Sequence, residues 1–147
     1  MYERIVVALD GSARGERALD QAVGLAASLG APLHLVRVAD MTWLRIGQTG
    51  AASRIAELSA EMAEERRQAD SYLDSLAESL RERRLTVTTE SRAGMAAKEL
   101  LDLARPGDLL VMSSHGRSGP VRWLLGSVAE EVVRASPCPV LLVRAAE

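Results

Sequence analysis

Three residue types are scarce in this sequence of 147 residues, which has no phenylalanine, one cysteine and one lysine. Without phenylalanine, aliphatic side chains must fill most of the core. The single cysteine, Cys138, excludes a disulfide within the chain and is typical of a reducing compartment, so we expect a cytoplasmic protein. Cys138 stands between two prolines, which favours a small buried hydrophobe over a nucleophile. The only lysine, Lys98, does not follow a glycine, so a Walker-type phosphate loop is excluded.

Neither a strong net charge nor a long apolar run is present. The 18 basic and 20 acidic residues leave a formal net charge of -2, which gives no electrostatic reason to expect nucleic-acid binding. No segment approaches the ~20 apolar residues of a membrane span, and the apolar run at residues 5–9 is too short for a signal peptide. We therefore expect one domain over residues 1–147, with neither nucleic acid nor membrane as a partner.

Apolar runs suited to buried strands alternate with segments of helical period. Strands are predicted at residues 5–9, 32–39, 85–89, 108–112 and 139–143, and helices at residues 13–29, 53–83, 95–104 and 127–135. The stripe of the long second helix fits a coiled-coil seam or packing on a sheet, and packing is favoured because the sheet needs a cover. The alternation predicts an α/β fold: one Rossmann-like, open, parallel five-stranded sheet with helices on both faces.

The first helix carries signals for both of its ends. Ser12 is a suitable N-cap, and Gly30 is placed to stop the helix. Its inward face is predicted from apolar residues at helical spacing, which are Ala18, Leu19, Ala22, Val23, Ala26 and Leu29.

A segment rich in glycine and serine, residues 113–127, joins the predicted fourth strand to the last helix. Glycine lets the main chain approach a ligand, and a helix N-terminus adds free N–H groups and the positive end of the helix dipole. This chemistry predicts an anion site, with the phosphate chain of a nucleotide as its occupant. Two alternatives stay open. Gly116 and Gly126 also suit plain turns, and Ser127 with Glu130 has the spacing of a capping box, in which the hydroxyl serves the helix.

Four polar side chains near this segment and the first strand have two interpretations each. Arg117 and Arg122 either screen phosphate charge or are solvated surface arginines. His115 has no acidic residue or cysteine at ligand spacing, so we interpret it as orienting the loop and not as a base or metal ligand. Asp10, at the end of the first strand, either binds a ribose hydroxyl or adenine edge or closes a turn.

The same segment resembles the nucleotide-binding segment of universal stress proteins. Their pattern is glycine, two residues, glycine, nine residues, glycine, then serine or threonine. Gly116, the nine residues 117–125, Gly126 and Ser127 fit it, whereas Ser113 replaces the first glycine. The resemblance covers nearly the whole chain, from residues 4–12 to residues 137–143.

This resemblance implies the strand order 3-2-1-4-5, in which the loops after the first and fourth strands border one crevice. It also implies that an adenine pocket lies against Ala8, Leu9 and Val38, partly through backbone groups, with Met112 packed beside them. The candidate nucleotide contacts are, in chain order, Ala8, Leu9, Asp10, Val38, Met112, Ser113, Gly116, Arg117, Gly126, Ser127 and Val128.

The expected function is ATP binding by a nucleotide-dependent regulatory module of the stress response, with Mg²⁺ as a chemically reasonable companion of the phosphates. The alternatives are a nucleotide-hydrolysing or nucleotidyl-transfer enzyme of related architecture, and a ligand-free protein-interaction module. No nucleophile–base pair, carboxylate pair or metal-ligand cluster is discernible in the sequence. We therefore expect no catalytic residues, no metal site and at most slow ATP hydrolysis.

The last predicted strand is apolar throughout residues 140–143 and, in the implied order, stands at an edge of the sheet. Such an edge exposes backbone donors and acceptors and favours pairing with a second copy. Relatives in the family form dimers of this type, so we expect a homodimer through residues 140–143. We also expect a signalling partner, which the sequence does not identify.

Overall fold

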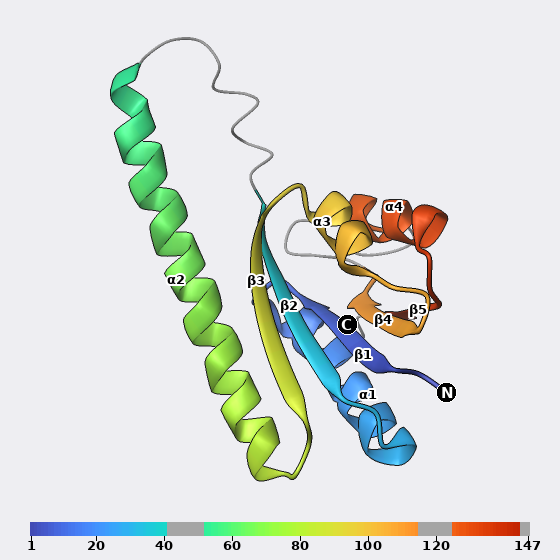
Figure 1. Cartoon of the computed structure of the whole chain (residues 1–147). Coiled ribbons are helices and arrows are strands. Elements are labelled where there is room, and N and C mark those ends of the chain that lie inside the picture. Colours follow the sequence, from blue (N-terminus) through green and yellow to red (C-terminus); the bar gives the residue numbers. More distant parts are fainter. Residues whose placement is uncertain (41–51, 115–124, 145–147) are drawn as a thin grey trace.

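A parallel sheet of five strands organises the computed structural model, which describes residues 1–40, 52–114 and 125–144. The strand order is β3-β2-β1-β4-β5, and all neighbouring strands are parallel (Figure 1). The predicted fold class and the order 3-2-1-4-5 are confirmed. The elements are the strands β1 (Arg4–Leu9), β2 (Leu33–Asp40), β3 (Val87–Gly94), β4 (Asp108–Ser113) and β5 (Val140–Val143), and the helices α1 (Ala13–Leu29), α2 (Ala52–Glu82), α3 (Ala96–Leu103) and α4 (Ser127–Ala135).

The central strand β1 contributes to a core on each face of the sheet. Successive side chains of a strand point to opposite faces. Ile5, Val7 and Leu9 therefore join the core against α1 and α2, whereas Val6 joins the core against α3 and α4. Helices on both faces explain why β1 is apolar at nearly every position.

Helix α1 begins and ends where the sequence predicts. The Ser12 side chain accepts a hydrogen bond from the Gly15 amide at 3.1 Å, and Gly30 ends the helix in the left-handed region at φ 65°. The predicted inward face is buried except for Leu29, which lies in the last turn and is 44% exposed.

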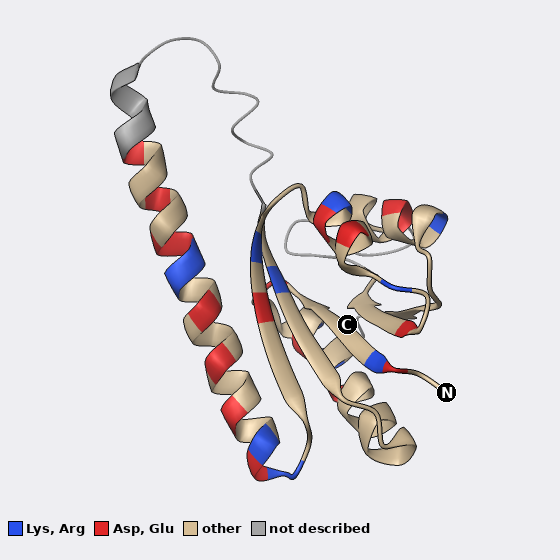
Figure 2. Cartoon of the chain, viewed as in Figure 1, with Lys and Arg blue, Asp and Glu red and all other residues tan. Residues whose placement is uncertain are grey.

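Helix α2 is much longer than the strands that it covers. Its C-terminal half packs on β2 and β3 through Ala69, Leu73, Ala77 and Leu80, each 5% exposed or less, which confirms packing on the sheet. The N-terminal part projects past the sheet (Figure 1). Acidic residues recur along the helix and keep its outer face polar (Figure 2). Among the described helices, none combines the length and apolarity that a membrane crossing requires.

Strand β3 differs from the prediction, which placed it at residues 85–89. It runs over Val87–Gly94 because β2 pairs with it along that whole length. Arg84, at φ 64°, lies in the turn that precedes it. The strand continues through Glu90 and Arg92 because an edge strand with half-exposed positions tolerates polar side chains.

An ion pair with a buried carboxylate joins β1 to β4 at the amino ends of the two strands. Arg4 Nε donates to Asp108 Oδ1 at 2.8 Å, and Arg4 Nη2 donates to Asp108 Oδ2 at 3.0 Å and to the Leu103 carbonyl at 3.0 Å. The main-chain amide of Arg105 donates to Asp108 Oδ2 at 2.8 Å. Asp108 is 1% exposed, so its charge depends on these donors. Together they tie two strands to the end of α3.

We expect Arg4→Leu to lower the free energy of unfolding by about 3 kcal/mol, because it leaves the Asp108 carboxylate buried without its cation. Urea unfolding of the variant measures the loss. Arg66→Leu on the exposed face of α2 is the control, with an expected change within about 0.5 kcal/mol. The double variant Arg4→Leu/Asp108→Asn should recover part of the stability. A loss below about 1 kcal/mol for Arg4→Leu would contradict the role given to this pair.

Candidate functional site

The order of the strands reverses at β1, which pairs with β2 on one side and with β4 on the other. The chain leaves β1 toward α1 and β2, and later returns to place β4 beside β1. In open parallel sheets a ligand crevice lies outside the carboxyl ends of the strands at such a reversal. Asp10 follows β1 and Ser114 follows β4, so both loops begin at this edge of the sheet.

The two ends of the glycine-rich segment meet at the carboxyl end of β4. The Ser114 amide donates to the Val143 carbonyl at 3.0 Å, and the Gly126 amide donates to the Ser114 carbonyl at 2.8 Å. Ser113 and Ser114 are therefore neighbours of Gly126 and Ser127, although the loop between them is long. The predicted contacts Gly116 and Arg117 lie outside the described residues, as do His115 and Arg122.

Helix α4 starts one residue earlier than a capping box at Ser127 requires. Gly126 is the N-cap, with φ -59° and ψ 152°, and no side-chain hydrogen bond caps the helix. The Glu130 amide donates to the Gly126 carbonyl at 2.9 Å. The capping-box alternative is therefore wrong, because the carbonyl that closes the first turn belongs to Gly126. Ser127 becomes the first, exposed residue of the helix, where the first-turn amides lack partners within the helix.

Apolar candidates come together on the α3 and α4 face of the sheet. Met112, 6% exposed, belongs to the core on this face, and the half-buried Ala8, Val38 and Val128 pack against that core. These four residues form an apolar wall beside the strand ends. Leu9 does not join them, because its side chain is 4% exposed in the opposite core. Only the main chain of Leu9 lies at this edge, in keeping with the backbone role implied for the pocket.

Asp10 closes the turn between β1 and α1. Its Oδ1 atom accepts hydrogen bonds from the Ser12 amide at 2.9 Å and from the Ser12 hydroxyl. The turn interpretation of Asp10 is thus realised through one carboxylate oxygen. The interpretation of Asp10 as a ligand contact stays a prediction, and the atom that would make this contact is Oδ2.

Sequence reasoning missed a cation next to the same turn. The guanidinium of Arg37 on β2 lies 5.1 Å from the ring centroid of Tyr72. A Cβ on Gly11 would stand 3.1 Å from that guanidinium, which is a tight contact, and the positive φ of 82° favours glycine there. The Tyr72 hydroxyl donates to Glu16 Oε1 at 3.2 Å. The pKa of Tyr72 is raised to about 12, mainly because the ring is partly buried and also because the Glu16 carboxylate lies next to it. The sequence signal that could have indicated this cation is the position of Arg37 inside a mostly apolar strand.

The described part of the candidate site has three distinct regions. One is the apolar wall, one is the Asp10 turn with its carboxylate, and one is the start of α4 beside two buried serines. Such a combination suits a ligand that is flat and apolar at one end and anionic at the other. Among the residues that the structure describes, no three His, Cys, Asp or Glu side chains are placed to hold a metal ion.

Comparison with known proteins places the whole chain among similar sequences and structures. A model of the Universal stress protein family matches residues 1–144. Universal stress protein MJ0531 of Methanocaldococcus jannaschii is 33% identical over 147 residues, which span 98% of this chain and 83% of that protein. The solved structure of hypothetical protein MJ0577 has a TM-score of 0.82 at 26% identity, over 100% of this chain and 99% of that one.

Two further solved structures of universal stress proteins are complexes with nucleotides. One is in complex with cAMP and has a TM-score of 0.66 at 24% identity, over 99% of both chains. The other, from Archaeoglobus fulgidus, is in complex with dAMP and has a TM-score of 0.57 at 20% identity, over 96% of this chain and 97% of that one. At these identities the two structures share the fold with this chain.

Proposed function

Because this chain belongs to the universal stress protein family, we propose that it binds a nucleotide, ATP in preference to others, as a regulatory module of the stress response. The 2.8 Å hydrogen bond from the Gly126 amide to the Ser114 carbonyl carries the proposal. It holds the N-terminus of α4 against the end of β4, beside the apolar wall. The family members in complex with cAMP and dAMP support a nucleotide in general.

Each region of the site takes one part of the nucleotide. The adenine ring packs against Ala8, Val38 and Met112, which are apolar and at least half-buried. Asp10 Oδ2 accepts a hydrogen bond from a ribose hydroxyl, because Oδ1 is already used by Ser12. The phosphates lie at the start of α4, where the Ser127 hydroxyl and the first-turn amides are donors. Ser113, Gly116, Arg117 and Val128 complete the proposed contacts.

A magnesium ion fits this arrangement with a single protein ligand. Mg²⁺ keeps several of its waters and is commonly held by one or two carboxylates together with substrate phosphates. Asp10, on the loop after β1, would supply this carboxylate through Oδ2, the same atom that otherwise accepts from the ribose hydroxyl. When bound, the ion neutralises phosphate charge, and the protein orients the nucleotide around it.

The compartment proposed for the protein is the cytoplasm. Cys138 is a free cysteine, 8% exposed, and packs in the core of the α3 and α4 face. A free thiol that serves as a small hydrophobe is in keeping with a reducing environment.

ATP should bind more tightly than AMP by roughly tenfold or more, because the start of α4 contacts the outer phosphates and AMP lacks them. Calorimetric titration with ATP, ADP and AMP measures the three affinities. Equal affinities for all three nucleotides would contradict the assignment of the phosphate chain to the start of α4.

Gly126→Asp should weaken ATP binding roughly a hundredfold, because a carboxylate then faces the phosphates at the helix start. The fold should persist, since φ -59° is open to any residue and Asp is a favourable N-cap. Gly126→Asn, with the same shape and no charge, is the matched control and should keep more of the affinity. Calorimetry reports binding and circular dichroism reports folding. A folded Asp variant with unchanged ATP affinity would show that the site is misplaced.

The proposed homodimer pairs β5 with its copy around a two-fold axis. Strand β5 is an edge of the sheet, and its four apolar residues, 140–143, are half-buried. Pro139 and Val143 accept ladder bonds from Leu110 and Ser114. Since hydrogen bonding alternates along a parallel strand, the odd-numbered residues face β4, and Val140 and Leu142 present their backbone groups outward.

Leu142→Pro should therefore weaken the dimer without removing a bond to β4, because it deletes an outward-facing amide. Leu141→Pro is the contrasting variant and should damage the sheet itself. Light scattering across micromolar dilution measures the mass, and thermal melting separates loss of pairing from loss of fold. A monomeric mass of the unmodified protein at every concentration would rule this interface out.

A further inference from the structure

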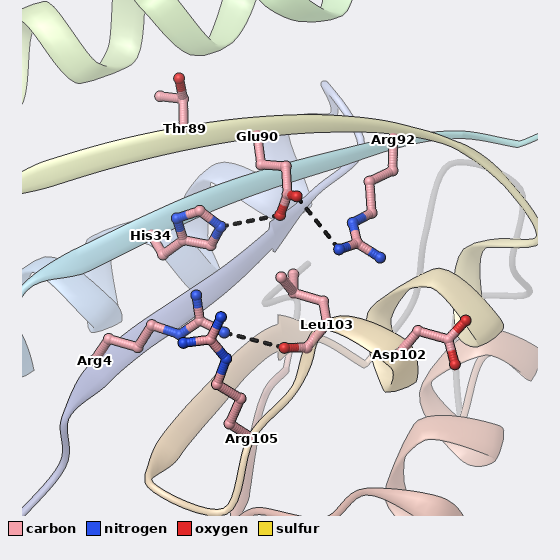
Figure 3. A pocket seen from close by; sticks show the side chains of 8 residues that line it. All are labelled: Arg4, His34, Thr89, Glu90, Arg92, Asp102, Leu103 and Arg105. Atoms are coloured by element: carbon pink, nitrogen blue, oxygen red, sulfur yellow. Dashed lines mark hydrogen bonds and ion pairs between the residues drawn. The ribbon is translucent and has the colours of Figure 1, made fainter.

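A polar cavity of about 360 Å³ lies on the α3 and α4 face of the sheet, close to the amino ends of β1 and β2 (Figure 3). Side chains from β1, β2 and β3 and from the end of α3 point into it, whereas the Thr89 side chain points away. Its lining consists of Arg4, His34, Thr89, Glu90, Arg92, Asp102, Leu103 and Arg105.

This cavity is separate from the proposed nucleotide site. Along β2, His34 and Val38 are four residues apart on the same face, which corresponds to about 13 Å at the usual rise per residue. Val36 lies between them and is fully buried, and Leu100 of α3, 3% exposed, belongs to the same core. A band of packed aliphatic side chains therefore divides the two.

One end of the cavity is formed by Arg4 and Arg105, which both bind the carboxylate of Asp108. Arg4 Nε and Nη2 donate to the Asp108 carboxylate, and Nη2 also donates to the Leu103 carbonyl. These hydrogen bonds hold the guanidinium in place and leave Nη1 for a ligand. The main chain of Arg105 is bound to the same Asp108 carboxylate. Both side chains reach the same end of the cavity (Figure 3). Among the described residues, the Arg105 guanidinium has no ion-pair partner.

The opposite wall is already neutralised by its own contacts. Glu90 is within 3.2 Å of His34 Nε2 and 3.3 Å of Arg92, and Arg92 also pairs with Glu99 at 3.3 Å. Burial alone would raise the pKa of Glu90, but the hydrogen bonds from His34 and Arg92 outweigh it and lower that pKa. Asp102 pairs with Lys98 at 2.7 Å on the outer side of α3. The carboxylates here thus have partners, two of them sharing Arg92, and the cation without an ion pair among the described residues of the lining is Arg105.

The charged residues around the cavity limit the net charge of the ligand that it can bind. Arg4, Arg92 and Arg105 face Glu90 and Asp102 across the lining. Asp108 on β4 and Lys98 and Glu99 on α3 bring the whole neighbourhood to balance. One extra negative charge beside Arg105 is favourable, and a dianion is not compensated.

We propose that this cavity binds the carboxylate group of a small organic monoanion, held between the guanidinium groups of Arg4 and Arg105. A guanidinium edge matches a carboxylate with two parallel hydrogen bonds, and a guanidinium held in place by Asp108 loses little freedom on binding. The volume leaves room for a small organic body next to Leu103. The lining favours this ligand over a phosphate, which carries about two negative charges near neutral pH.

Amide resonances of the full-length protein test this proposal. Sodium acetate, sodium benzoate and inorganic phosphate are titrated at about pH 7 and constant ionic strength, with chloride as the reference anion. The amides of Glu90, Leu103 and Arg105 should shift saturably with acetate and benzoate. Shifts no larger than those caused by chloride would overturn the site, and tighter binding of phosphate would overturn the assignment to a monoanion.

Three variants locate the binding. Arg105→Gln should weaken benzoate binding roughly tenfold, because it removes the unpaired charge and its donor fork but keeps the main-chain bond to Asp108. Arg66→Gln, on α2 at the opposite face of the sheet, should leave the affinity unchanged. Gly126→Asp, which blocks the proposed nucleotide site, should also leave it unchanged. Equal benzoate affinity of the Arg105→Gln and unmodified proteins, or loss of binding in Gly126→Asp, would refute the proposal.

Discussion

The parallel pairing of β1 with β4 is the constraint on which the rest of this structure depends. Without it the strand order would not reverse, and the loops after β1 and β4 would not meet. The two ends of the pair differ in chemistry. At the amino end, Arg4 and Asp108 close it with a buried ion pair, and at the carboxyl end the chain diverges into the Asp10 turn and the glycine-rich segment.

The ion pair acts mainly by fixing positions. Two buried ions lose their hydration, so a buried salt bridge is weak evidence for stability compared with an apolar pair. Asp108, however, binds the side chain of Arg4 and the main chain of Arg105, which belong to different elements. A slip of β4 against β1 would separate the Arg4 guanidinium from a carboxylate that is 1% exposed, and only the local bond from the Arg105 amide would remain. The penalty for that state specifies the register, and the register in turn places Ser113 and α4.

The parts of the fold that depend on local pattern could be predicted from sequence, and those that depend on pairing could not. The apolar run of β1, the Ser12 cap and the Gly30 stop are local signals, and each matches the structure. The strand order came from the family resemblance and not from periodicity. Glu90 and Arg92 gave no strand signal because pairing with β2 extends β3 through them. In the site, spacing predicted Gly126 and Ser127 as ligand contacts, which stays a prediction, and the structure shows that Gly126 and not Ser127 is the N-cap of α4. Arg37 was missed because its contact with Tyr72 depends on the packing of α2 against the sheet.

The same alternation of side chains explains why one face of the sheet carries two different surfaces. Along β2, His34, Val36 and Val38 all point toward α3 and α4, and they change from polar to apolar in that order. On β1, Arg4, Val6 and Ala8 repeat the change. Because parallel strands keep like ends together, the polar ends gather into a charged cavity and the apolar ends gather into a wall. The fully buried Val6 and Val36 separate the two surfaces with tightly packed aliphatic groups. Charge at one surface is therefore compensated locally, by Asp108 and Glu90, and leaves the wall at the other free to accept an uncharged ring.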